Sequence, residues 1–149
     1  MEACPNAETT PHCLRKNVMA VLAEMGLEHR TDERSDIVFR YSDATFYVIF
    51  SPDDGDYLRL VYPWFWEPDD EHDLPLALKA ANIANQRIKV IKIILIGCKA
   101  LAVAENYIAD ISVLRKRLPQ FLELMFTACD EFMAEFDRMH EPEGESSSD

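Results

Sequence analysis

The chain has 149 residues, which matches the roughly 100 to 200 residues of one ordinary domain and favours a single hydrophobic core. Its 27 acidic residues against 15 lysines and arginines give a formal net charge of -12, which opposes binding to nucleic-acid phosphates and to anionic membranes. Hydrophobic residues make up 48% of the chain and charged residues 28%, a balance typical of soluble globular proteins.

The amino terminus has neither the basic start nor the apolar stretch of a signal peptide, so we expect a cytoplasmic protein. The most apolar segment, residues 90–96, contains Lys92 and is far shorter than the ~20 residues of a membrane-spanning helix, so no membrane span is expected. The cysteines lack a Cys-x-x-Cys spacing, which predicts free thiols in a reducing compartment. They are Cys4, Cys13, Cys98 and Cys129.

Composition divides the chain into three parts. Residues 1–11 contain two prolines and few apolar groups, which predicts a flexible lead-in. Residues 12–140 carry the apolar periodicities of one domain. Residues 141–149, EPEGESSSD, combine acidic groups with serines and have nothing to bury, which predicts a disordered acidic tail.

The first elements of the domain are one helix and three strands. Apolar residues recur at helical spacing over 12–25, and Gly26 follows as a terminator. Three segments of alternating apolar residues then predict strands at 37–41, 46–50 and 58–66. Short polar turns separate them, so the strands are expected to run antiparallel as a meander.

A second helix is predicted over 74–88, followed by a hairpin of two strands at 90–96 and 101–107. The last segment, 111–139, has apolar residues at alternating steps of three and four and predicts a long amphipathic helix. Pro119 cannot donate a helical hydrogen bond, so a kink or restart is expected there. The predicted fold is α+β, in the order α-β-β-β-α-β-β-α, with a five-stranded antiparallel sheet.

Known catalytic and ligand-binding motifs are absent from the sequence. The histidines and cysteines lack metal-ligand spacings, the glycines are isolated rather than gathered in a phosphate loop, and no nucleophile motif occurs. We therefore predict no metal, no cofactor and no catalytic residue, and a non-enzymatic function.

Apolar side chains exceed what one face of each element can bury. In an extended strand Tyr62, Trp64 and Trp66 point to one side and Phe65 to the other. The apolar arc of the last helix spans roughly 200°, about twice what docking on one core requires, and its outer part holds Phe126 and Met133. These six residues are the predicted partner-binding surface, for a second copy in a homodimer or for a client peptide in an apolar groove or at a sheet edge.

Two other readings stay open. A small-molecule or enzymatic pocket between the sheet and the second helix would use Arg59, Asn82 and Asn85 as its polar groups, and the two asparagines share a helix face. Against it, the asparagine amides can simply bind backbone groups beside the sheet. A purely structural subunit of a larger complex is the other possibility.

Three segments, together with the order of elements, resemble the bacterial YbjN family over about residues 36–138. They are YLRLVYPWFW at 57–66, AANIANQRIKVIK at 80–92 and LAVAENYI at 101–108. The resemblance implies the fold of type III secretion chaperones, which are small, acidic, usually dimeric proteins with an amphipathic carboxy-terminal helix. The family label, sensory transduction regulator, implies a regulatory role, and the family supplies no catalytic residues.

Overall fold

The computed structural model describes residues 11–140. The predicted lead-in, apart from Pro11, and the predicted acidic tail lie outside the described residues. Within 11–140 the chain forms three α-helices, one short 3-10 helix and six strands. They are α1 (Pro11–Glu24), β1 (His29–Thr31), β2 (Ile37–Tyr41), β3 (Ala44–Phe50), β4 (Tyr57–Trp66), η1 (Glu71–Asp73), α2 (Leu74–Arg87), β5 (Ile91–Ile96), β6 (Lys99–Tyr107) and α3 (Ile111–His140).

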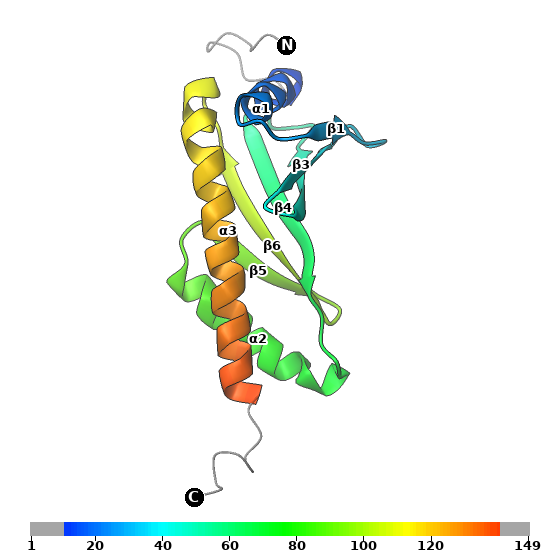
Figure 1. The fold of residues 1–149 in the computed structure, drawn as a ribbon, viewed down its shortest axis with the longest axis vertical. Helices are drawn as coiled ribbons and strands as arrows, with labels where there is room; N and C mark the ends of the chain where they lie inside the picture. Colours follow the sequence, from blue (N-terminus) through cyan, green and yellow to red (C-terminus); the bar gives the residue numbers. More distant parts are fainter. Residues whose placement is uncertain (1–10, 141–149) are drawn as a thin grey trace, which may run out of the picture.

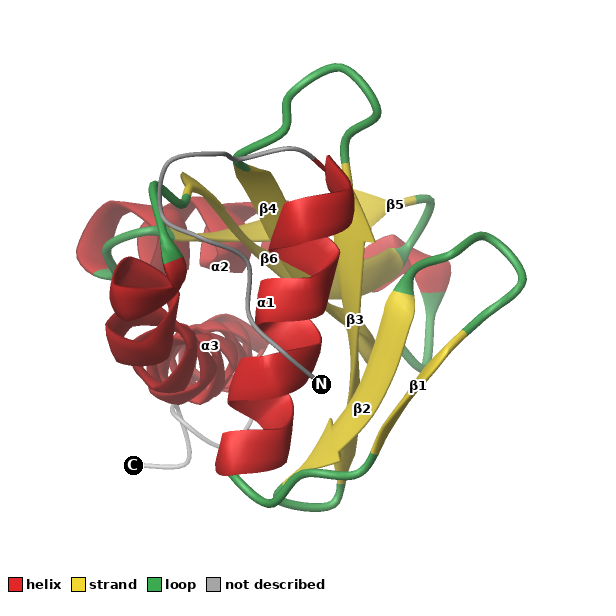
Figure 2. Cartoon of the chain, turned by 90° about the horizontal axis from the view of Figure 1, so that it is seen from above, coloured by secondary structure: helices red, strands yellow, loops and turns green. Residues whose placement is uncertain are grey.

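The strands form one antiparallel sheet in the order β1-β2-β3-β4-β6-β5, and the three α-helices gather on one side of it (Figure 2). The α+β class is confirmed, whereas the prediction of five strands is wrong because β1 adds a sixth. Its three residues, His29, Arg30 and Thr31, carry no alternation of apolar and polar side chains. They form a strand because they pair with β2, where their partners are Phe39, Val38 and Ile37 in that order.

The main core lies between the sheet and the helices. The inward rows of the central strands are fully buried, including Leu60 of β4 and Ala102 of β6, at 0% exposure. Short alanine side chains along β6 let α3 approach the sheet closely, and Leu118 and Leu122 of α3 are buried in the same cluster. The amphipathic pattern predicted over 111–139 therefore faces this core.

Helix α3 runs along the whole length of the molecule (Figure 1). Its 30 residues span about 45 Å at ~1.5 Å per residue. The helix continues from Ile111 to His140 with Pro119 inside it, so the predicted restart does not occur. Leu118 and Phe121 on either side of the proline are buried, and this tertiary packing outweighs the loss of one helical hydrogen bond.

Among the three cysteines within residues 11–140, one differs from the prediction, and Cys4 lies outside the described residues. Cys13, in the first turn of α1, is buried and disulfide-bonded, so the expected free thiol is wrong there. Cys98 and Cys129 are free. A disulfide requires the two Cα atoms to lie about 4.4 to 6.8 Å apart, a condition set by the folded chain rather than by spacing in the sequence.

Candidate functional site

The end of β4 departs from regular strand geometry. β4 pairs with β6 at Tyr62↔Ala102 and next at Trp66↔Ala100, so two extra residues of β4 lie between these pairs, with a register shift. Trp64 sits in this bulge with φ +47°, a left-handed conformation that is costly for a bulky side chain, and it is 50% exposed. The alternation predicted for this segment is therefore wrong at Trp64 and Phe65, whereas Tyr62 and Trp66 lie on one side as predicted.

The bulge turns two neighbouring aromatic residues toward the same helix. Phe65 lies 5.6 Å from Phe132 of α3, and Trp66 lies 5.2 Å from the same ring, measured between ring centroids. Trp66 also contacts Phe136 at 4.9 Å. All three pairs are edge-to-face, the arrangement that aromatic rings favour. Phe65 and Trp66, which were predicted to bind a partner, thus pack between β4 and α3.

Phe126 continues this row toward the amino-terminal end of α3. Its ring lies 5.9 Å from Tyr41, 5.7 Å from Phe46 and 5.9 Å from Tyr62. The hydroxyl of Tyr41 donates a 2.7 Å hydrogen bond to Glu123, which raises the pKa of that phenol. Burial is the main cause of a raised pKa at Tyr62. The phenol groups of both tyrosines therefore stay protonated at neutral pH.

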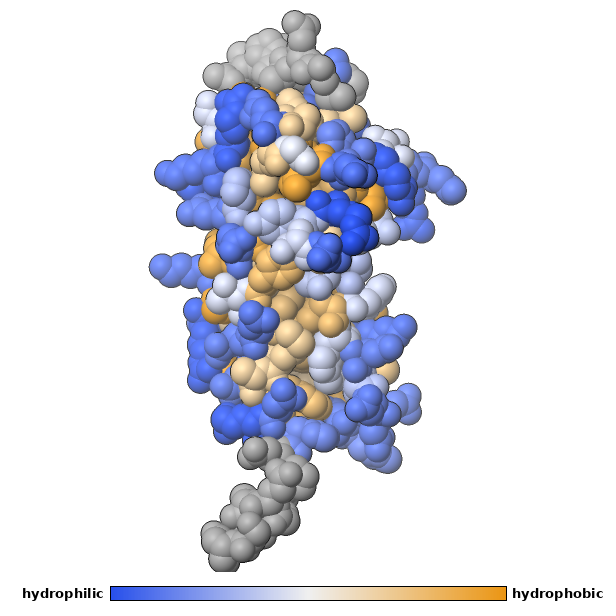
Figure 3. Space-filling view, viewed as in Figure 1, coloured by the Kyte–Doolittle hydropathy of each residue, from blue (hydrophilic) through white to orange (hydrophobic). Residues whose placement is uncertain are grey.

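Five of the six predicted partner-binding residues, together with Tyr41, which was not predicted, pack on the main core and keep part of their surface exposed. We call this set the aromatic seam, and it consists of Tyr41, Tyr62, Phe65, Trp66, Phe126 and Met133. Trp64 stands apart from it as an exposed ring. Figure 3 shows a band of apolar surface along the length of the same face, bordered by polar side chains on both sides.

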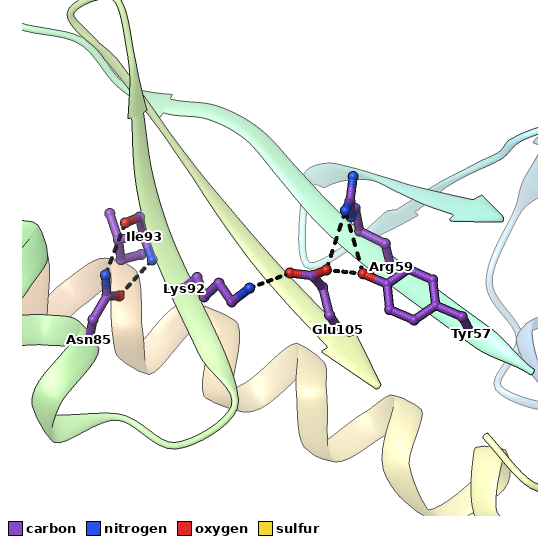
Figure 4. Close-up of polar contacts among 6 residues, drawn as sticks. All are labelled: Tyr57, Arg59, Asn85, Lys92, Ile93 and Glu105. Carbon is purple, nitrogen blue, oxygen red and sulfur yellow. Dashed lines mark hydrogen bonds and ion pairs between the residues drawn. The ribbon is translucent and has the colours of Figure 1, made fainter. Parts of the chain in front are cut away.

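The predicted residue Arg59 belongs to a polar cluster on strands β4, β5 and β6 (Figure 4). It lies between the buried residues Leu58 and Leu60, so its side chain points away from the helix-covered face. Glu105 of β6 accepts hydrogen bonds from Arg59 at 3.3 Å, from Lys92 at 2.7 Å and from the hydroxyl of Tyr57. This arrangement is a surface ion-pair network, whose contribution to stability is about 1 kcal/mol or less for each exposed pair.

The two asparagines of the alternative pocket have different roles. Asn85 of α2 donates a 3.1 Å hydrogen bond to the carbonyl of Ile93 and accepts a 2.7 Å bond from its N–H (Figure 4). Asn82 is exposed. Asn85 therefore occupies the edge of β5, as the backbone-binding explanation proposed, and the structure does not bring Arg59, Asn82 and Asn85 together in a pocket.

A hollow that the sequence did not indicate lies beside β1. It is open to solvent, has a volume of about 440 Å³, and is lined by Glu28, His29, Arg30, Val38, Phe39, Arg40 and Thr45. Its lining comes from the three strands β1, β2 and β3 and from Glu28, the residue before β1. Because β1 was not predicted, no sequence signal could have placed Arg30 beside Val38.

The remaining reactive groups offer little chemistry. Burial, with a smaller contribution from Asp130, strongly raises the pKa of the Cys129 thiol, so this side chain is neither a thiolate nucleophile nor a ready metal ligand. Among residues 11–140, no three histidine, cysteine or carboxylate side chains are grouped to hold a metal ion. Over the same range, no helix combines the length and the apolar character needed to cross a membrane.

Comparison with known proteins identifies a family and finds solved structures with a similar fold. The family model for YbjN, described as "Putative bacterial sensory transduction regulator", matches residues 14–138. No curated protein matches the chain. A crystal structure of an uncharacterized protein from Methanothermobacter thermautotrophicus is similar, with a TM-score of 0.61 and 17% identity over 85% of this chain and 99% of that one, which shows a shared fold. The match to the family model covers most of the domain, and the chain therefore belongs to the YbjN family.

Proposed function

We propose that this protein is a non-enzymatic protein-binding module with a chaperone-like or regulatory role, that it forms a homodimer, and that it acts in the cytoplasm. The family description is compatible with a regulatory or binding role. The type III secretion chaperone-like fold implied by the resemblance is part of the same proposal. Binding of a client protein or peptide is the activity we assign to it.

The observation that carries the proposal is the aromatic seam. Its side chains contact the buried core, yet they remain partly exposed to solvent along one face of α3. Extended apolar strips on soluble proteins commonly mark surfaces that another protein covers. The seam therefore supports a protein partner better than a small ligand.

A second copy fits the position of the seam. Phe126 lies at the midpoint of α3, which runs from Ile111 to His140. A two-fold axis near Phe126 would place two α3 helices antiparallel, so that the same residues of both copies meet in one self-complementary interface. Such an interface would cover Met133 of each chain.

The test replaces Met133 by aspartate and measures the sedimentation coefficient of the full chain by analytical ultracentrifugation. Met133 is preferred to Phe126, because Phe126 contacts the fully buried Phe46 and its replacement would destabilise the monomer as well. We expect the unaltered chain to sediment as a dimer and Met133→Asp to sediment as a folded monomer, since a charge would be buried without a partner.

The matched control is Ala134→Asp, which adds the same charge at the next position, an exposed one on the solvent side of α3. It should remain dimeric. A wild-type chain that sediments as a monomer at tens of micromolar, or a Met133→Asp variant that dimerises as well as Ala134→Asp, would show that the seam does not join two copies.

A further inference from the structure

We propose that β1 is the site where an extended peptide of a partner protein adds to the sheet as a seventh strand, with an acidic side chain of that peptide seated in the hollow beside Arg30 and Arg40. This inference rests on the proposed binding function and names both the site and the chemistry of the partner. Its evidence is independent of the aromatic seam.

The first step concerns the backbone groups of β1. The backbone carbonyl of Glu28 accepts a hydrogen bond from the N–H of Arg40. At the other end of the β1–β2 ladder, the N–H of Asp32 donates to the carbonyl of Asp36. In an antiparallel ladder the bonded pairs alternate, so the N–H and C=O groups of His29 and Thr31 point away from β2. They form an open sheet edge, to which an added strand can bind through its own backbone.

The opposite edge of the sheet is covered at its centre. At β5 the outward N–H and C=O of Ile93 both bind the side chain of Asn85, and α2 packs along the strand. No comparable cover lies over β1 within residues 11–140, and β1 projects away from the helices (Figure 1). Strand addition is therefore directed to one edge of this sheet.

The hollow supplies side-chain selectivity. Arg30 lies opposite Val38, and Arg40 lies opposite Thr45, so these side chains share the sheet face that the helices leave uncovered. Val38 is buried at 5% exposure and contributes an apolar side chain to the lining. Successive side chains of an added strand alternate between faces, so every second one would enter the hollow.

The charges of the hollow favour a carboxylate. Arg30 forms no ion pair within the described part of the chain. Arg40 lies 3.9 Å from the carboxylate of the fully exposed Asp43 and donates a 3.3 Å hydrogen bond to its carbonyl. Glu28 is the acidic side chain in the lining. Two free or weakly paired guanidinium groups thus face a single acidic side chain in this lining, and guanidinium groups bind carboxylates with matched geometry.

The test measures fluorescence anisotropy of labelled heptapeptides with the full chain. The probes are Ser-Val-Thr-Glu-Thr-Val-Ser and the versions with Gln or Lys at the central position. We expect the Glu peptide to bind most tightly, and Arg30→Gln and Arg40→Gln each to weaken it by up to about fivefold while leaving the Gln peptide nearly unchanged. Glu28→Gln should strengthen binding of the Glu peptide. Lys79→Gln, which removes an exposed cation on α2, is the control and should have little effect.

The backbone part of the inference is tested by Thr31→Pro and by amide hydrogen exchange. The proline removes an outward N–H and no bond to β2, so it should abolish binding of all three peptides in a chain that remains folded by circular dichroism. In the unaltered chain, bound Glu peptide should slow exchange of the His29 and Thr31 amides, and amides of β5 should be unaffected.

Several outcomes would overturn the inference. They are equal binding of the Glu and Lys peptides, protection at β5 instead of β1, or equally tight binding of a peptide with the chain's own sequence EPEGESSSD. A change in sedimentation caused by Thr31→Pro would instead assign β1 to a second copy. If the peptides fail to bind while Met133→Asp still dissociates the dimer, only this inference is wrong and the proposed function stands.

Discussion

Replacing Asn85 by alanine should destabilise the protein by about 2 kcal/mol. The substitution removes two hydrogen bonds, at 2.7 and 3.1 Å, to a backbone residue whose exposure is only 3%. A typical intramolecular hydrogen bond contributes about 1 kcal/mol net, and a buried backbone group left without a partner raises the cost. The two bonds together set the expected magnitude.

Urea denaturation followed by circular dichroism measures this change. With a slope of about 2 kcal/mol per molar, as small domains show, the midpoint should fall by about 1 M. Opening the β5 edge should also promote association, detectable by light scattering at high protein concentration.

Asn82→Ala provides the matched control, because it deletes the same side chain three residues earlier on the same helix. Both asparagines are exposed, but the side chain of Asn82 makes no hydrogen bond within residues 11–140, so the free energy of unfolding of Asn82→Ala should change by less than about 0.5 kcal/mol. If the two variants unfold at the same urea concentration, Asn85 does not hold the edge of β5, and the argument that strand addition is directed to β1 loses one of its two supports.

Two further predictions concern α3. Pro119→Ala should raise the free energy of unfolding by up to about 3 kcal/mol, because alanine restores a helical N–H and removes the clash of the proline ring. Urea denaturation measures this change. A lower stability of the variant would mean that packing of the proline ring outweighs the lost hydrogen bond. The Cys129 thiol, whose pKa burial raises strongly, should resist dithionitrobenzoate at pH 8 in the native chain and react only in urea, whereas half-buried Cys98 should react first. Equal rates for the two thiols in the native chain would contradict the buried placement of Cys129.

Long periodic segments were predictable from sequence, because their burial pattern follows from a single period. The alternating steps of three and four over 111–139 correspond to α3, and the alanines at 100, 102 and 104 correspond to the buried face of β6. The backbone-binding role expected of Asn82 and Asn85 is confirmed for Asn85 only. In each case the local pattern and the tertiary packing agree, as expected for a well-specified fold.

The features that escaped prediction depend on residues far apart in the chain. β1 exists because β2 pairs with it, and its three residues carry no strand pattern of their own. Trp64 adopts φ +47° because packing of Phe65 and Trp66 against α3 compensates for the strained bulge. A strict period of two cannot represent this compensation, so the orientations of Trp64 and Phe65 were assigned wrongly, whereas Tyr62 and Trp66 both face α3.

The two proposed surfaces can be separated because β2 contributes to both from opposite faces. Phe39 and Tyr41 point toward the helices, where Tyr41 stacks on Phe126, whereas Val38 and Arg40 point toward the hollow. A dimer formed through the aromatic seam would therefore leave the β1 edge of each copy open, and a dimer would offer two peptide sites. A partner with two acidic strands would then bind more tightly to the dimer than to the Met133→Asp monomer, without any new contact, because the second binding event becomes intramolecular.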